Sequence, residues 1–216
     1  MLVLAISFNY YNIVIGPLKT IFQWNVFKKV LLHTKGSYDR IIIYYSLTLL
    51  LIGGIREDAE ELIFSTYGED IQVDFRKWNP PQEIKIYSEK KARSRFMFDH
   101  VYFWKISESN SLVGVAILDN VLGKSLPITY LTCFNMDGQL INAHIVKYRE
   151  DYGYEVGNRR WLNQFLGLNA SSDYKVGKNI DGISGATISV NSVTRGINRS
   201  AIIVEHLLTK KDAGSY

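Results

Sequence analysis

The sequence predicts an α+β fold in which an antiparallel sheet of hairpins packs against helices, with a membrane segment near the N-terminus. Three observations support this prediction. Residues 101–148 contain two pairs of β-branched and aromatic runs, and a short polar turn joins the runs of each pair. Apolar residues recur at spacings of three and four after residue 187, as in an amphipathic helix. Residues 41–55 form an apolar run without any charge.

The apolar run at 41–55 reads IIIYYSLTLLLIGGI, with a basic residue before it and acidic residues after it. As a helix it would extend about 22 Å, which is short of the roughly 30 Å of a bilayer core. This length suits a signal peptide or a short signal-anchor, and residues 1–40 would then be a basic leader or a cytoplasmic segment. A buried core helix or a pair of strands is the alternative. A second membrane segment within residues 1–15 also stays open.

The net charge of +4 comes from the first 40 residues, which hold five basic side chains and one acidic side chain. The remaining chain is neutral and offers no electrostatic footprint for a phosphate backbone, so we expect no nucleic-acid partner. Basic residues beside an apolar segment stay in the cytoplasm under the positive-inside rule. The sequence therefore predicts a protein of the cell membrane whose folded part is extracytoplasmic, on the periplasmic or outer face.

The 216 residues, 47% of them hydrophobic, suffice for one well-buried domain beyond the anchor. Its expected elements, in chain order, are a helix at 58–64, a segment at 83–98 after two prolines, a hairpin of 101–106 with 112–118, a hairpin of 128–135 with 139–148, a short helix at 161–166 and a final helix after 187. The single cysteine, Cys133, excludes an intramolecular disulfide framework and predicts a buried thiol.

Residues 181–187 read DGISGAT and lead into the final amphipathic pattern. A glycine-containing loop before a helix leaves free backbone N–H groups at the positive end of the helix dipole, where a phosphate group can bind. The small residues Gly185 and Ala186 keep the hydroxyl of Thr187 accessible. The alternative is that Ser184 or Thr187 only caps the helix, as serine and threonine often do.

The pattern D-x-x-[ST]-G-A-T in these residues resembles the flavinylation motif of the FMN-binding domain, which is found in the C subunit of sodium-translocating NADH:quinone reductase and in the G subunit of the Rnf complex. The resemblance covers about residues 85–205, and we expect the FMN-binding domain to span residues 57–210. In that family a magnesium-dependent flavin transferase esterifies the last threonine of the motif to the phosphate of FMN. The resemblance therefore implies covalent FMN on Thr187, while Ser189 offers a second hydroxyl two residues further on.

The resemblance departs from the family pattern at residues 148–151. Many members have histidine, any residue, glutamate and threonine there; Glu150 matches this pattern, whereas Tyr148 and Asp151 do not. The four histidines are far apart and lack metal-ligand spacing, so we expect no metal site, and we expect no catalytic residue of the protein's own. The expected cofactor-binding residues are Thr187, Ser184, Gly185, Ala186, Asp181, Glu150 and Tyr148.

The implied function is that of an extracytoplasmic electron-transfer protein, a carrier or a subunit of a flavin-dependent oxidoreductase complex rather than a stand-alone enzyme. Its partners would be a flavin transferase during maturation and a membrane reductase or other redox partner afterwards. Asp181 would either orient the transferase or its metal, or form an Asx turn or a loop cap. Two alternatives stay open, namely a module that binds FMN or another phosphorylated ligand without a covalent bond, and a structural subunit of a membrane redox complex.

Overall fold

The computed structural model describes residues 54–209. The predicted leader at 1–40 and nearly all of the apolar run at 41–55 lie outside these residues. Within the described range, no helix combines the length and the apolar composition that a membrane span requires.

Within residues 54–209, five strands form one antiparallel sheet in which every strand pairs with its neighbours in the sequence. The strands are β1 (Gln72–Trp78), β2 (Val101–Glu108), β3 (Ser111–Leu122), β4 (Pro127–Asn135) and β5 (Leu140–Lys147). Both predicted hairpins are confirmed, and β2, β3 and β4 are longer than expected. In the tight turn between β4 and β5, Gly138 has a φ of 73°, and Asn135 Oδ1 accepts hydrogen bonds from the backbone N–H groups of Asp137 and Gln139.

Strand β1 is an edge strand that the sequence pattern did not predict. It pairs with β2 over its whole length, from Gln72 opposite Ser107 to Trp78 opposite Val101. Its sequence, QVDFRKW, mixes charged and apolar residues, and only Trp78 is buried. Charged side chains are common on edge strands because they oppose pairing with other chains, so such a strand carries a weak hydrophobic signal.

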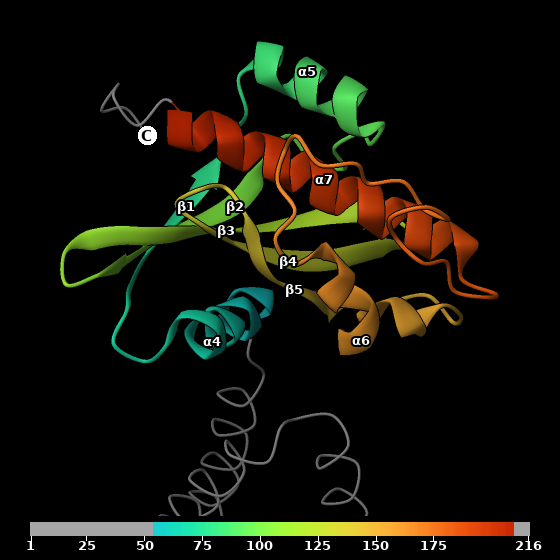
Figure 1. Ribbon diagram of the computed structural model, residues 1–216, viewed down its shortest axis with the longest axis horizontal. Coiled ribbons are helices and arrows are strands. Elements are labelled where there is room, and N and C mark those ends of the chain that lie inside the picture. Colours follow the sequence, from blue (N-terminus) through green and yellow to red (C-terminus); the bar gives the residue numbers. More distant parts are fainter. Residues whose placement is uncertain (1–53, 210–216) are drawn as a thin grey trace, which may run out of the picture. The chain divides into compact units, whose positions relative to one another are not determined.

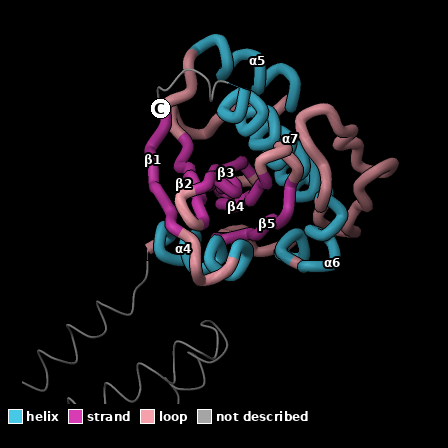
Figure 2. The backbone as a smooth tube through the Cα atoms, turned by 60° about the vertical axis from the view of Figure 1, so that its left-hand side comes forward, coloured by secondary structure: helices cyan, strands magenta, loops and turns pink. Residues whose placement is uncertain are grey.

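The helices lie on both faces of the sheet, with α5 (Gln82–Ala92) and α7 (Thr187–Thr209) over one face and α4 (Ile55–Tyr67) under the other (Figures 1 and 2). Alternate residues of the central strands face the two sides, as the period of a strand requires. Phe103 and Ile117 belong to the apolar core beneath α7, and their neighbours Trp104 and Ala116 belong to the core above α4.

The remaining elements connect β5 to α7. They are two 3₁₀ helices, η1 (Tyr154–Gly157) and η2 (Asn163–Phe165), with the four-residue helix α6 (Arg159–Leu162) between them. The helix expected at 161–166 is therefore split. The segment expected at 83–98 is helical only to Ala92, because Arg93 adopts the left-handed conformation with a φ of 52°. Cys133 is fully buried as predicted, and burial raises the pKa of its thiol to about 12.

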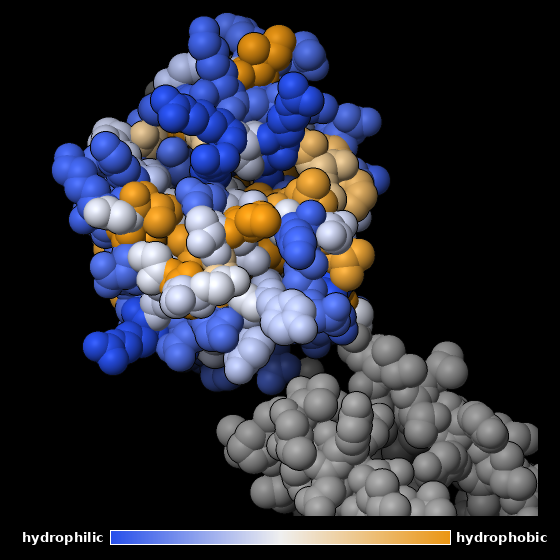
Figure 3. All heavy atoms as spheres, turned by 90° about the vertical axis from the view of Figure 1, so that its right-hand side faces the viewer, coloured by the Kyte–Doolittle hydropathy of each residue, from blue (hydrophilic) through white to orange (hydrophobic). Residues whose placement is uncertain are grey.

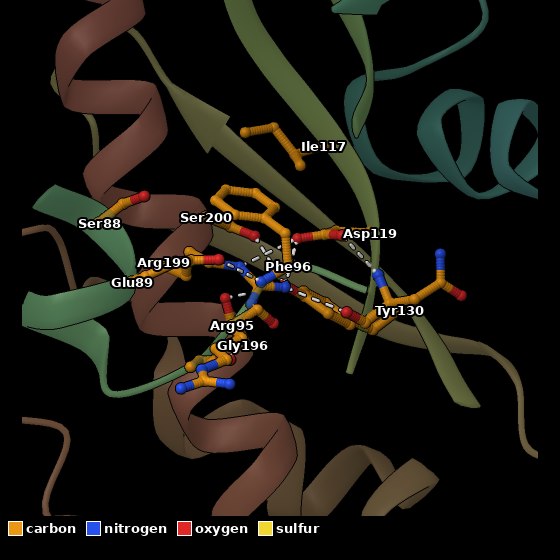
Figure 4. A network of polar contacts seen from close by, with 12 residues as sticks. Ser88, Glu89, Arg95, Phe96, Ile117, Asp119, Tyr130, Gly196, Arg199 and Ser200 are labelled. Carbon is orange, nitrogen blue, oxygen red and sulfur yellow. Dashed lines mark hydrogen bonds and ion pairs between the residues drawn. The ribbon is translucent and has the colours of Figure 1, made fainter. Parts of the chain in front are cut away.

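A buried ion pair fixes α7 on the sheet (Figure 4). The side chain of Arg199 is inaccessible to solvent, and its Nη2 lies 2.6 Å from Oδ2 of Asp119 on β3. The same guanidinium group donates hydrogen bonds to Asn120 O (3.0 Å), to Ser94 Oγ (2.8 Å) and to Arg95 O (2.5 Å). One side chain of α7 thereby contacts β3 and the segment that follows α5.

Tyr130 completes this buried network from β4. Its hydroxyl donates to Gly196 O (2.8 Å) on α7 and lies 3.2 Å from Ser200 Oγ. Glycine is required at position 196 because a Cβ there would lie 3.0 Å from the Tyr130 ring and 2.6 Å from Val121. The network holds α7 in one position along the sheet. The sheet therefore determines where the first residue of the helix lies in space.

Candidate functional site

A tight turn precedes α7 and presents its first residue to solvent. The backbone N–H of Ala186 donates to Ile183 O (3.1 Å), and Gly185 has a φ of 79° in the third position of this turn. Glycine adopts that conformation without the strain that a Cβ imposes. Ala186 is buried, and its carbonyl accepts the first hydrogen bond of the helix from Val190. Thr187 follows as the first helical residue and is exposed.

The three hydroxyl groups near this helix start have different surroundings. Thr187 and Ser184 are exposed, and neither side chain forms a hydrogen bond to another described residue. Neither hydroxyl therefore acts as the helix cap that the alternative interpretation required. Ser189 is only 5% exposed, and its Oγ lies 2.9 Å from the hydroxyl of Tyr148. Thr187 is therefore more accessible to a modifying enzyme than Ser189.

The start of α7 also fits a phosphate group. In any α-helix the N–H groups of the first turn have no acceptor within the helix. Here those groups belong to residues 187–189, at the positive end of the dipole of a helix of 23 residues. Among the described residues, no side chain accepts a hydrogen bond from them. An exposed hydroxyl beside unpaired N–H groups suits a phosphoester, because these groups can bind its oxygens.

Three consecutive side chains after β5 connect the end of that strand to three other segments. The Tyr148 hydroxyl donates to Tyr152 O (2.5 Å) and also contacts Ser189 on α7. Arg149 Nη1 donates to Pro127 O and to Thr129 Oγ1 on β4, both at 3.0 Å. Glu150 Oε1 accepts hydrogen bonds from the backbone N–H groups of the loop between β3 and β4, at Ser125 (2.6 Å) and Leu126 (2.9 Å).

The contacts of Glu150 give it a defined structural role. The N–H groups of Leu126 and Ser125 stabilise the carboxylate and hold its pKa below the usual range. Gly123 of the same loop is packed so closely that a Cβ there would lie 2.5 Å from Glu150 Oε1. Because this oxygen is engaged by backbone groups, the structure supplies a reason for a glutamate here other than ligand contact. Direct binding of a cofactor by Glu150 and Tyr148 stays a prediction.

The backbone of Asp181 is held on both sides, whereas its carboxylate is not. Trp161 Nε1 donates to Asp181 O (2.8 Å), and the N–H of Asp181 donates to Gln164 Oε1 (2.8 Å). The exposed carboxylate accepts no hydrogen bond from the described residues, so the Asx turn considered for it is not formed. Trp161 and Gln164 precede Asp181 by 17 residues or more, so no local sequence pattern identified them as supports of the motif.

An open hollow of about 410 Å³ lies beside this aspartate. It is lined by Glu155, Asn158, Arg160, Trp161, Gln164, Asp181 and Ile183. Both charge signs and an indole ring thus occur within one hollow next to the motif.

The segment after β5 packs directly on the start of α7. Gly153 has a φ of 87°, and a Cβ there would lie 3.3 Å from Ala186 Cβ and 3.1 Å from Ser189 Oγ. On either side of it, Tyr152 is 83% exposed and Tyr154 is 68% exposed. Figure 3, viewed from the side on which α7 begins, shows apolar and weakly polar side chains gathered in the middle of this face.

Comparisons with known proteins agree with the motif. Residues 123–201 match the family model of the FMN-binding domain. The chain is also similar to the G subunit of the ion-translocating oxidoreductase complex of Buchnera aphidicola subsp. Acyrthosiphon pisum (strain APS), with 26% identity in an alignment of 132 positions that covers 54% of this chain and 80% of the relative. The resemblance drawn from the sequence is therefore confirmed.

Proposed function

We propose that this chain, whose residues 123–201 match the FMN-binding domain family, is an electron-transfer subunit that carries FMN as a phosphoester of Thr187. The observation that supports this most directly is the placement of Thr187. Its hydroxyl is exposed at the first residue of α7, has no partner among the described residues, and lies beside the unpaired N–H groups of the first turn. When bound, FMN supplies one- and two-electron transfer, and the protein supplies attachment and electrostatics.

The neighbouring residues of the motif have separate tasks in this proposal. Gly185 and Ser184 form the turn that brings Thr187 to the surface, and buried Ala186 anchors the turn to the core. Asp181 keeps a free carboxylate on a backbone fixed by Trp161, so we assign it to contact with the flavin transferase or its magnesium ion during maturation. The phosphate of the attached cofactor would lie against the N–H groups of residues 187–189, where the helix dipole favours its negative charge.

The sequence and the similar protein support a proposal for the setting of this chain. The similar protein is named as a subunit of an ion-translocating oxidoreductase complex, so we assign this chain to a membrane redox complex in which a reductase or another redox subunit is its partner. The apolar run at 41–55 would anchor it, and the part at 57–210 would lie outside the cytoplasm as the FMN-binding domain. A covalent bond suits that compartment because lost FMN is not readily replaced there.

Co-expression with a flavin transferase tests the attachment. Intact mass and in-gel flavin fluorescence are measured for the wild type, Thr187→Ala and the matched control Ser189→Ala. We expect the wild type and Ser189→Ala to gain the mass of one FMN less water, and Thr187→Ala to gain nothing. An unmodified wild type beside a transferase that labels another substrate would refute the proposal. Flavin that copurifies with Thr187→Ala without an added mass would indicate a non-covalent binding module.

A further inference from the structure

Residues 152–154 are fastened to the start of α7 by one hydroxyl group. A carbonyl oxygen can only accept, so the single O–H of Tyr148 is donated to Tyr152 O, 2.5 Å away. The Ser189 hydroxyl, 2.9 Å away, must then donate to the Tyr148 oxygen. One tyrosine therefore links the loop to the third residue of α7 through a directed pair of hydrogen bonds.

The loop around Gly153 is tightly packed against Tyr148 and Ser189. Gly153 is buried, and a Cβ there would lie 2.8 Å from Tyr148 Oη, closer than real Cβ atoms approach such an atom. The Ser189 side chain is also buried, so water does not compete freely for its hydrogen bond with Tyr148. Gly153 therefore packs closely against Ala186, the residue immediately before Thr187.

This link presents two aromatic side chains whose rings have no aromatic partner among the described residues. Tyr152 and Tyr154 flank Gly153 and are 83% and 68% exposed, the two highest values among the exposed large hydrophobic side chains of the described residues. Ile188, the residue after Thr187, is also 51% exposed. Gly153, between the two tyrosines, packs against Ala186 and Ser189, so both rings are attached close to Thr187. Exposed aromatic side chains beside an attachment site offer a surface for a flat ligand ring.

We propose that Tyr152 and Tyr154 form the surface on which the isoalloxazine ring of the FMN on Thr187 rests, and that Tyr148 and Ser189 are positioning residues for this surface. The inference rests on the proposed function, because the ribityl chain tethers the ring close to Thr187. Tyr148 acts through the loop, because its hydroxyl is engaged by Tyr152 O and Ser189.

Hydrogen exchange of the full-length protein without flavin tests the positioning pair. Tyr148→Phe retains the ring but removes the hydroxyl, and Tyr87→Phe on the exposed face of α5 is the matched control. We expect amide exchange in residues 152–156 to accelerate about tenfold in Tyr148→Phe and to stay unchanged in Tyr87→Phe. Equal exchange in Tyr148→Phe and the wild type would overturn the positioning role.

Flavin fluorescence of the loaded protein tests the aromatic surface. Intact mass first establishes full loading, and iodide quenching then measures access of solvent to the ring. Contact with aromatic side chains quenches flavin fluorescence, so we expect a severalfold increase in emission and easier quenching by iodide in the double variant Tyr152→Ser with Tyr154→Ser. We expect a smaller increase in Tyr148→Phe and none in Tyr87→Phe. A fully loaded double variant with wild-type emission and iodide access would overturn the aromatic surface.

The two experiments separate this inference from the function on which it rests. A wild type that stays unmodified beside an active transferase would overturn the proposed attachment and the aromatic surface together. The exchange measurement needs no flavin, so it still decides whether Tyr148 fixes the loop.

Discussion

Helix α7 carries two polar sites, at Arg199 and at Thr187, which differ in burial and in hydrogen-bond partners. At Arg199 the polar groups are buried and paired, with Asp119 on β3 and Ser94 after α5 as partners, and Tyr130 on β4 donates to the same helix at Gly196 O. At Thr187 the hydroxyl is exposed and has no partner among the described residues. The first site fixes the helix, and the second leaves chemical groups available for a ligand. A functional site built on a rigid element is held more accurately than one built on a loop.

The buried ion pair of Arg199 and Asp119 serves mainly to position α7 on the sheet and contributes less to stability. Removing two charges from water costs several kcal/mol, by order of magnitude, and a well-packed apolar pair often serves stability equally well. The hydrogen bonds of Arg199, however, can be satisfied in only one register of α7 relative to β3. That register sets the position of Thr187. The buried network at Arg199 therefore determines where the exposed hydroxyl of Thr187 lies.

The largest effect is expected from breaking the buried ion pair. Asp119→Ala leaves the charge of Arg199 buried without its partner, and we expect the free energy of unfolding to fall by about 3–5 kcal/mol. Arg76→Ala is the control, because its ion pair with Asp74 lies at the surface and should contribute less than about 1 kcal/mol. Urea unfolding followed by circular dichroism measures both. A loss at Asp119 no larger than the loss at Arg76 would contradict the comparison.

His144, on the other face of the sheet, contains a buried polar atom without a partner among the described residues, in contrast to the paired Arg199. His144 on β5 lies opposite Leu131, and its Nε2 is buried without a hydrogen-bond partner. Burial, and then the charge of Arg159, lower the pKa of His144 from 6.5 to about 4. The folded state therefore resists protonation, so His144 reduces stability progressively as the pH falls from about 6.5 to about 4.

His144→Gln should remove this pH dependence. After allowance for partial exposure, we expect the wild type to lose about 1–2 kcal/mol more than the variant between pH 7 and pH 4. Urea unfolding at a series of pH values measures the difference. Parallel stability curves for the two proteins would show that His144 is protonated in the folded state without cost.

The sequence predicted those parts of the fold whose signals are local. Two hairpins and the final helix were predicted because their periodic patterns reflect burial on one face. The edge strand β1 was missed because its charged residues hide that pattern. Asp119 and Arg199 are 80 positions apart, so no local pattern could pair them.

The same limit applies to the candidate site. The glycine-containing loop and the accessible hydroxyl of Thr187 depend on adjacent residues, and the sequence predicted both. The link from Tyr148 to Ser189 spans 41 positions and depends on where β5 ends relative to α7. Residues that act through such tertiary contacts are evident only once the chain is folded.

Gly185→Ala tests the turn that presents Thr187. The added Cβ meets no atom within 4 Å, so the cost comes only from the φ of 79° and should be about 1 kcal/mol. Gly182→Ala is the matched control, because Gly182 also has open space around it but no positive φ. We expect unchanged stability in Gly182→Ala and slower flavin transfer in Gly185→Ala, measured by intact mass over time. Equal stability of the two variants would mean that the turn tolerates a side chain.

The smallest effect on stability is expected at the position where the effect on function is largest. Because the Thr187 hydroxyl has no partner among the described residues, Thr187→Ala should change the free energy of unfolding by less than about 0.5 kcal/mol in the protein without flavin. A threonine that capped the helix would instead cost about 1 kcal/mol when replaced by alanine. Urea unfolding of the unmodified protein separates the two cases. A loss of about 1 kcal/mol in the free energy of unfolding would give Thr187 a structural role and remove the contrast with Arg199. An unchanged urea midpoint, together with a missing flavin adduct, would leave flavin attachment as the function of Thr187.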